Sequence, residues 1–167
     1  MTGGVMMFNL FGKKRVPLAL AATANGRVKP LSEVTDPVFA SGIMGAGYGI
    51  DPASDRIVSP VSGKVTMIAN TLHGIGIHTE EGLDVLIHMG INTVELKGVP
   101  FTISVKVGER IQSGQDLATM QRSIVEASGK STTIIVVVTN SKDLELAVEV
   151  NDGAIEAGEV AAVIELL

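Results

Sequence analysis

From residue 18 onward, the hydrophobic positions form short runs that are typical of β-strands. The runs are rich in Val, Ile, Leu and Ala, and they are separated by Gly, Pro, Asn and Asp, which favour turns. Only residues 36–43 and 120–127 have the apolar spacing of a helix, and both segments are short. The pattern therefore predicts an all-β protein, an antiparallel β-sandwich or barrel of short strands with only short helical turns.

Two short sequence patterns each occur twice in the chain. Residues 22–28 (ATANGRV) resemble residues 59–65 (SPVSGKV), and residues 111–115 (IQSGQ) resemble residues 155–159 (IEAGE). Each copy has a glycine at a position where a tight turn can need positive φ. These internal repeats predict a sandwich or barrel that is built from related hairpins.

Residues 71–90 form the strongest candidate for a functional element, because they resemble two β-strands that fold back at Glu80-Glu81-Gly82. Facing residues of an antiparallel pair have a constant index sum, so a turn centred between Glu80 and Glu81 pairs His73 with His88. A shift of one residue would move one histidine to the opposite face. In the predicted register, His78 lies on the opposite face. The face of the two histidines also carries Ile75, Ile77, Asp84 and Leu86.

Two imidazoles side by side on an apolar surface offer a nitrogen lone pair and a neighbouring N–H donor. Two cations at this distance would repel, so at least one ring should be neutral at about pH 7. Gly74, Gly76 and Gly90 weaken strands unless a molecule approaches the backbone closely. His78 is interpreted as structural. For the His pair, the spacing alone leaves a structural and a functional reading open.

The run from His88 to Gly98 (HMGINTVELKG), preceded by Thr71-Leu72-His73, resembles the signature of a known domain family. This family is the glucose-type enzyme IIA domain of the bacterial phosphoenolpyruvate-dependent sugar phosphotransferase system. The resemblance implies a single enzyme IIA domain over residues 17–167, of the duplicated hybrid motif type, after an N-terminal tail of residues 1–16. Further matches are residues 38–40 with Gly45 and Gly47, residues 59–65, and Lys130-Ser131 before the strand at residues 134–140.

The resemblance implies a phosphotransferase that relays a phosphoryl group for sugar uptake and phosphorylation. His88 matches the family's phosphorylated histidine, His73 its companion, and Thr71 the hydroxyl that orients the companion. The donor would be the phosphorylated histidine-containing carrier protein, and the acceptor a cysteine of the enzyme IIB domain of a sugar permease. Regulatory proteins are a further class of partner in this family. The expected partner-binding residues are Asp36, Phe39, Ile43, Met44, Leu86, Asn92 and Val94.

The sequence departs from many family members around the two histidines. Ala69, Gly76 and Leu86 stand at positions that are often Phe, and Asn92 replaces a common aspartate. These substitutions leave His73 and His88 unchanged. They alter the surface that partner proteins would contact.

The composition limits the function classes further. The net charge of −5 argues against a nucleic-acid-binding protein and favours partners with a basic face. The sequence has no cysteine, which excludes disulfides and fits a cytoplasmic location. No apolar run is long enough to span a membrane. No cofactor or metal is expected, because the family's donor is already a high-energy phosphoramidate and the chain has no Gly-x-x-x-x-Gly-Lys-Ser/Thr loop for a nucleotide.

Residues 7–15 (MFNLFGKKR) combine two Phe and a Leu with three consecutive cations. One interpretation is a weak anchor on anionic lipid, which would give at most peripheral membrane contact. The other, which we prefer from the sequence, is a disordered tail.

Three other functions share single features with this sequence. A catalytic zinc site normally has three protein ligands, and Asp84, the nearest acid expected on the same face, would lie about 13 Å along the strand from His88. The turn pattern of residues 107–117 also occurs in biotinyl and lipoyl carrier domains, but Lys64 beside Gly63 is a poor match for their modified lysine. A regulatory binding module without relay activity is the third alternative, and the intact histidine pair argues against it.

Overall fold

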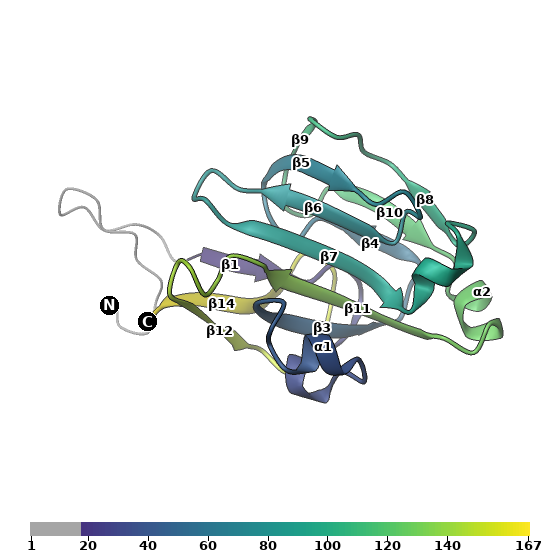
Figure 1. Ribbon diagram of the computed structural model, residues 1–167, viewed down its shortest axis with the longest axis horizontal. Helices are drawn as coiled ribbons and strands as arrows, with labels where there is room; N and C mark the ends of the chain where they lie inside the picture. Colours follow the sequence, from purple (N-terminus) through teal and green to yellow (C-terminus); the bar gives the residue numbers. More distant parts are fainter. Residues whose placement is uncertain (1–17) are drawn as a thin grey trace.

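The computed structural model describes residues 18–167, so the predictions for the N-terminal tail concern residues outside this range. The described chain has fourteen β-strands, two short α-helices and two 3₁₀ helices, which confirms the predicted all-β class (Figure 1). The helices α1 (Pro37–Ala40) and α2 (Arg122–Ala127) occur where helical turns were predicted. Within residues 18–167, no helix is long and apolar enough to cross a bilayer.

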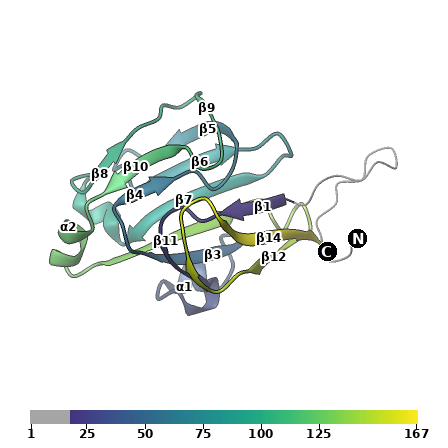
Figure 2. The same ribbon diagram turned by 180° about the vertical axis from the view of Figure 1, so that it is seen from behind.

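The strands form one large sheet and two small ones, and all pairings are antiparallel. Figure 2 shows the two small sheets on the side of the large sheet that faces away from the viewer in Figure 1. The large sheet has the order β13 (Gly153–Ile155), β2 (Gly26–Pro30), β3 (Ala46–Pro52), β11 (Ser131–Val138), β7 (Asp84–Ile91), β6 (Gly74–His78), β5 (Gly63–Ile68), β9 (Arg110–Ile111). The small sheets are β1 (Leu18–Ala21), β14 (Val160–Leu166), β12 (Leu146–Val150), and β4 (Arg56–Val58), β10 (Asp116–Met120), β8 (Phe101–Ile103). The 3₁₀ helices are η1 (Leu31–Glu33) and η2 (Thr93–Leu96).

The large sheet has apolar side chains on both faces near its centre. Its inner face packs into the main core, where Ile75 of β6 and Ile87 of β7 are fully buried. Its outer face carries a smaller apolar cluster, in which Ile135 and Val137 of β11 pack with Phe39 of α1. Because β11 is covered on both faces, residues 134–138 form a continuous apolar run rather than an alternating one. Each fully buried Val or Ile side chain contributes about 1.5 to 3 kcal/mol to stability.

The sequence repeats form equivalent turns in the structure. Ala22 N donates to the carbonyl oxygen of Glu159 at 2.7 Å, and in the other copy Ser59 N donates to the carbonyl oxygen of Gln115 at 2.8 Å. Gly114 and Gly158, at the turns of the second repeat, have positive φ, at 88° and 90°. Gly26 and Gly63 of the first repeat lie in strands β2 and β5 without positive φ, so the expected turn conformation is wrong for these two glycines. The fold is therefore built from related hairpins, as the repeats predicted.

The hairpin of β6 and β7 has a different register from the predicted one. Gly74, rather than His73, pairs with His88, so the index sum is 162 instead of 161. The connecting loop spans residues 79–83 and is therefore centred on Glu81. Within the loop, the Thr79 hydroxyl accepts a hydrogen bond from Leu83 N at 3.0 Å. Two backbone bonds also close the loop, from Thr79 N to the carbonyl oxygen of Leu83 at 2.9 Å and from Gly82 N to the carbonyl oxygen of Thr79 at 3.0 Å.

This change of register corrects the predicted faces of the hairpin. Ile75 and Ile77 lie in the core, on the face opposite His88. His78 lies on the same face as His88 and pairs with Asp84, with Nδ1 at 2.6 Å from Oδ1. Asp84 and Leu86 are on the His88 face, as predicted.

Candidate active site

His88 lies near the end of β7, on the outer face of the large sheet, and is half-buried. Its Nδ1 is 2.8 Å from the carbonyl oxygen of Gly90. A carbonyl oxygen can only accept a hydrogen bond, so Nδ1 carries the proton and donates it. The neutral ring therefore has its lone pair on Nε2.

Gly90 makes the backbone turn that brings this carbonyl to the ring of His88. Its φ is +79°, in the left-handed region that favours glycine. An ideal Cβ on Gly90 would lie 2.4 Å from Cγ2 of Thr93, which is too close for any side chain. The position therefore requires glycine for two independent reasons.

His73 lies just before the first residue of β6 and approaches His88 from the loop. Leu72, with φ of +64°, bends the chain at this point. The imidazoles meet edge to face, with centroids 5.1 Å apart and planes at 81°. The predicted proximity of the two histidines is confirmed, although they are not a cross-strand pair. Nδ1 of His73 lies 2.7 Å from Oγ1 of Thr71.

Phe39 also contacts the ring of His88, with centroids 5.0 Å apart and planes at 56°. Phe39 is held by α1, whose N-cap is Asp36. The Asp36 carboxylate accepts hydrogen bonds from Val38 N at 2.9 Å and Phe39 N at 3.4 Å. Asp36, which was predicted to bind partners, therefore also fixes the helix that packs on the histidine.

Burial lowers the pKa of both His73 and His88 below the ordinary histidine value. The pKa of His88 is lowered first by burial and then by the neighbouring His73, since two imidazolium ions would repel. The Gly90 carbonyl and the Asp36 carboxylate act in the opposite direction on this pKa. Both rings are therefore neutral at about pH 7.

The predicted partner-binding residues have different environments. Ile43 and Val94 are exposed apolar side chains, with 68% and 48% of their surface accessible. Phe39 is buried and Leu86 is half-buried. They pack beneath the exposed residues and offer little surface of their own to a partner protein. Met44 and Asn92 are also exposed, Asn92 in a left-handed turn with φ of +62°.

Sequence reasoning missed three features of this surface. Val38 of α1 is half exposed beside Phe39. The Gly90 carbonyl, which fixes the tautomer of His88, is a backbone group that no side-chain pattern identifies. Thr93 is fully buried behind the turn, although it belongs to the run from His88 to Gly98 that was singled out.

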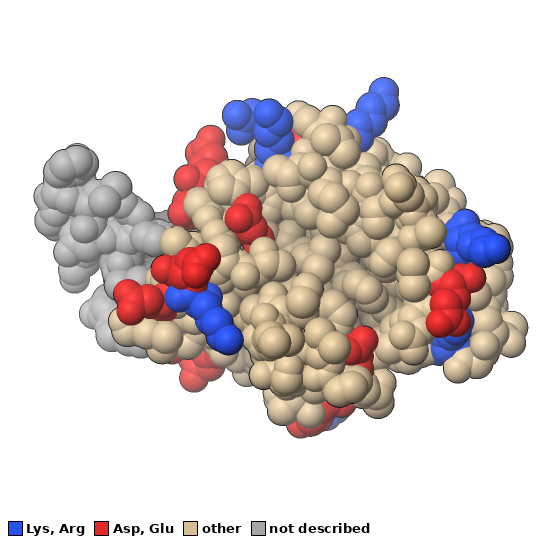
Figure 3. Space-filling view, in the orientation of Figure 1, with Lys and Arg blue, Asp and Glu red and all other residues tan. Residues whose placement is uncertain are grey.

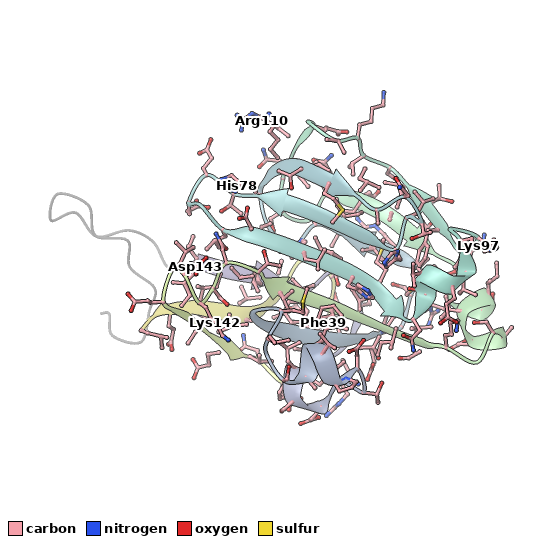
Figure 4. All side chains as sticks on the ribbon, viewed as in Figure 1. Phe39, His78, Lys97, Arg110, Lys142 and Asp143 are labelled. Atoms are coloured by element: carbon pink, nitrogen blue, oxygen red, sulfur yellow. The ribbon has the colours of Figure 1, made fainter. Side chains whose placement is uncertain are left out.

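The face that carries the two histidines has few charged groups. Figure 3 shows that Lys, Arg, Asp and Glu gather around its edges and leave a broad uncharged centre. In Figure 4, Phe39 lies at α1 near this centre, whereas Lys97, Arg110 and Lys142 lie toward the periphery. Such a surface fits contact with another protein better than contact with a highly charged polymer.

Among residues 18–167, no group of three or more His, Cys, Asp or Glu side chains is arranged to hold a metal ion. Asp84, the acid considered for a zinc site, is paired with His78.

Residues 18–144 match the model of a family described as the phosphoenolpyruvate-dependent sugar phosphotransferase system, EIIA 1. The chain belongs to this family. The resemblance inferred from the histidine motifs is therefore confirmed, and His73, His88 and Thr71 all lie inside the matched region.

Three EIIA relatives illustrate how far the similarity extends. The glucose-specific EIICBA component of Streptococcus pneumoniae is 41% identical over 145 residues, which cover 87% of this chain and 20% of that protein. The glucose-specific EIIA component of Bacillus cereus is 37% identical over 134 residues, covering 80% of this chain and 81% of that protein. The solved structure of glucose permease IIA from Mycoplasma capricolum has a TM-score of 0.78 and 32% identity, covering 89% and 96% of the two chains.

The chain spans about a fifth of the length of the multidomain relatives that it matches, including the beta-glucoside-specific EIIBCA component of Bacillus subtilis. Other relatives, such as the Bacillus cereus protein, are close to this chain in length. The EIIA unit therefore occurs both alone and as part of larger proteins.

Proposed function

We propose that this EIIA protein relays a phosphoryl group in a sugar phosphotransferase system, with His88 as the acceptor. The observation that carries the proposal is the hydrogen bond from Nδ1 of His88 to the carbonyl of Gly90. It leaves the lone pair on Nε2, which is the form of imidazole that can attack phosphorus. The lowered pKa keeps the ring in this neutral form.

The donor in this proposal is the phosphohistidine of the histidine-containing carrier protein. The Nε2 lone pair of His88 forms a new P–N bond while the P–N bond of the donor breaks, and the donor nitrogen takes back the electron pair. No proton has to leave Nε2, because the ring proton is already on Nδ1, where Gly90 accepts its hydrogen bond. The product is a phosphohistidine on Nε2 of His88.

His73 acts in this proposal on the oxygens of the group in transfer. The Thr71 hydroxyl lies 2.7 Å from Nδ1 of His73. In this proposal the hydroxyl is the donor and Nδ1 the acceptor. The ring proton of His73 is then on Nε2, from which it can be donated to a phosphoryl oxygen and stabilise its charge. The apolar surround, including Phe39, limits competing attack by water while two proteins are docked.

The acceptor after His88 is a cysteine of an enzyme IIB domain. The multidomain relatives support this step, since their EIICBA and EIIBCA names combine the A component with B and C components in one protein. Their names include both glucose and beta-glucoside. In this proposal the permease, and not the EIIA unit, selects the sugar. The exposed apolar side chains Ile43, which follows α1, and Val94, in η2 after the His88 strand, would contact both donor and acceptor.

Intact-mass analysis tests the relay directly. The protein is incubated with phosphoenolpyruvate, enzyme I and the carrier protein from the same source, and then with a IIB domain. We expect wild type to gain one phosphoryl group and His88→Ala to gain none. His73→Gln should be loaded but pass the group on poorly. His78→Gln is the matched control, because His78 is an exposed histidine of the same hairpin, and it should behave like wild type.

Two results would overturn the proposal. The first is a wild-type protein that stays unmodified, which would favour a regulatory binding module. The second is full loading of His88→Ala, which would place the phosphoryl group on another residue.

A further inference from the structure

Thr93 lies directly behind the turn that carries Gly90, and it takes no direct part in the proposed phosphoryl transfer. It follows β7 at the start of η2 and is fully buried. Its hydroxyl donates a hydrogen bond to the carbonyl oxygen of Met89 at 2.6 Å. Because Thr93 has no access to solvent, water cannot replace this bond without a change in packing.

Met89 connects Thr93 to the loop of His73. Its N–H donates to the carbonyl oxygen of His73 at 2.7 Å, while its own carbonyl accepts from Thr93. Met89 is therefore hydrogen-bonded on both sides, through its N–H to the His73 loop and through its carbonyl to Thr93. Neither of these bonds involves an imidazole ring, so they act on the backbone that positions the rings.

The carbonyl of Met89 and the N–H of Gly90 belong to one planar peptide group. Fixing the orientation of this group fixes the direction in which the chain enters the left-handed turn at Gly90, where φ is +79°. The same turn brings the Gly90 carbonyl to 2.8 Å from Nδ1 of His88. The methyl group of Thr93 occupies the space that a side chain at Gly90 would need, so it packs against the turn as well.

We propose that Thr93 is a positioning residue for phosphoryl transfer: its hydroxyl holds the Met89–Gly90 peptide so that the Gly90 carbonyl keeps the proton of His88 on Nδ1. The lone pair is then always on Nε2, the nitrogen that faces a docked partner. The kinetic consequence rests on the proposed function, since the tautomer matters for transfer only if His88 is the nucleophile. The effect on the tautomer itself does not depend on that function.

Three variants separate the hydroxyl from the packing. Thr93→Val removes the hydroxyl and keeps the branched shape, whereas Thr93→Ser keeps the hydroxyl and loses the methyl group. Thr79→Val is the matched control, because Thr79 is a buried threonine at the other end of the same hairpin and its hydroxyl also bonds the backbone. All three should lose stability, but only Thr93→Val should change His88.

The first measurement is ¹⁵N NMR of the His88 ring nitrogens at a pH where the ring is neutral. Wild type, Thr93→Ser and Thr79→Val should show a proton on Nδ1 and a free lone pair on Nε2. Thr93→Val should show a mixture of both tautomers. The His88 titration of Thr93→Val should also move to lower pH, because the Gly90 carbonyl, which raises the pKa of His88, is no longer held.

The second measurement is the rate of phosphorylation by the carrier protein. We expect Thr93→Val to be slower by about tenfold, the factor that one hydrogen bond of ordinary strength is worth, with Thr93→Ser close to wild type. A folded Thr93→Val protein with wild-type tautomer and rate would overturn the proposal. A folded Thr93→Ser protein in which Nδ1 of His88 has lost its proton would also overturn it. If Thr93→Val does not fold, the tautomer of His88 in Thr93→Ser tests the proposal.

The proposal and the proposed function fail in different ways. If wild type accepts no phosphoryl group, the relay fails, but the NMR comparison still decides whether Thr93 sets the tautomer. If wild type is phosphorylated and Thr93→Val is indistinguishable from it in both measurements, the role of Thr93 fails while the relay stands.

Discussion

The imidazole of His73 lies edge to face against that of His88, with centroids 5.1 Å apart, although the two residues are not paired across the hairpin. The backbone joins them instead, through the bond from Met89 N to the carbonyl of His73. This arrangement allows the two rings to influence each other's protonation while each keeps its own hydrogen-bond partner, Thr71 or Gly90. The influence can be measured.

We predict that His73→Gln raises the pKa of His88. Burial and His73 both lower this pKa in the wild type, so removal of His73 leaves burial as the cause that lowers it. An NMR titration of the His88 ring should show the midpoint moving up toward the ordinary histidine value. His78→Gln should leave the midpoint where it is, and an unchanged midpoint in His73→Gln would show that the two rings do not interact.

The same lowered pKa predicts how wild-type stability depends on pH. A buried histidine binds its proton less tightly in the folded protein than in the unfolded chain, so stability rises with pH. For His88, the contribution is fully present above the unfolded-state pKa of about 6.5 and is lost as the pH falls through that value to the lowered folded-state pKa. Urea unfolding at a series of pH values should show a weaker dependence in His88→Gln than in wild type over this window.

We predict that Thr71→Val slows the transfer from His88 to the IIB domain by about tenfold, the scale of one lost orienting hydrogen bond. Without the hydroxyl 2.7 Å from Nδ1, the ring of His73 can rotate and exchange tautomers. Thr71→Ser keeps the hydroxyl and should retain most of the rate. Single-turnover transfer from the loaded protein checks this, and equal rates for Thr71→Val and wild type would contradict the orienting role.

The fold and the position of the site could largely be predicted from the sequence because they depend on local chemistry. Asp36 before Pro37 is a helix cap followed by a residue that starts helices well, and α1 begins there. The apolar run at residues 134–138 predicts a strand buried on both faces, which is the place of β11 between β3 and β7. The family motif then singled out His73 and His88, whose rings the structure brings within 5.1 Å of each other.

The register of the hairpin was predicted wrongly because the turn was centred between Glu80 and Glu81, whereas the loop of residues 79–83 is centred on Glu81. The alternation of apolar residues in the two strands favours the observed register, because it pairs Ile75 with Ile87 and Ile77 with Val85 on the buried face. His73 still reaches His88, because the left-handed Leu72 bends the chain before the strand begins. The Gly90 carbonyl and the buried Thr93 act through the backbone, where sequence patterns carry little information.

We predict that Gly90→Ala destabilises the protein by about 2 to 4 kcal/mol. A non-glycine residue at φ of +79° costs about 1 to 2 kcal/mol, and the new methyl group would also collide with Thr93. Gly82→Ala is the matched control, because Gly82 has φ of +93° but no atom within 4 Å of an added Cβ. Urea denaturation should therefore give about 1 to 2 kcal/mol for Gly82→Ala. Equal losses would show that the contact with Thr93 does not matter.

We predict that Ile43→Glu weakens docking of the carrier protein without weakening the fold. Ile43 exposes 68% of its surface just after α1, the helix that packs Phe39 against His88, so a carboxylate there would be desolvated when a partner binds. The KM for the carrier protein should rise about tenfold, which corresponds to a contact residue worth somewhat more than 1 kcal/mol. The free energy of unfolding should change by no more than about 0.5 kcal/mol, as is usual for exposed positions.

Val107→Glu is the control for this prediction, because Val107 is similarly exposed, at 60%, but lies in the segment between β8 and β9, away from the histidine face. It should leave both the KM and the unfolding free energy close to wild type. If both variants raise the KM equally, the effect comes from the added negative charge, since a more acidic protein steers a partner differently at long range. Repeating both assays at higher salt separates these explanations, because screening removes the long-range effect and leaves the loss of the Ile43 contact.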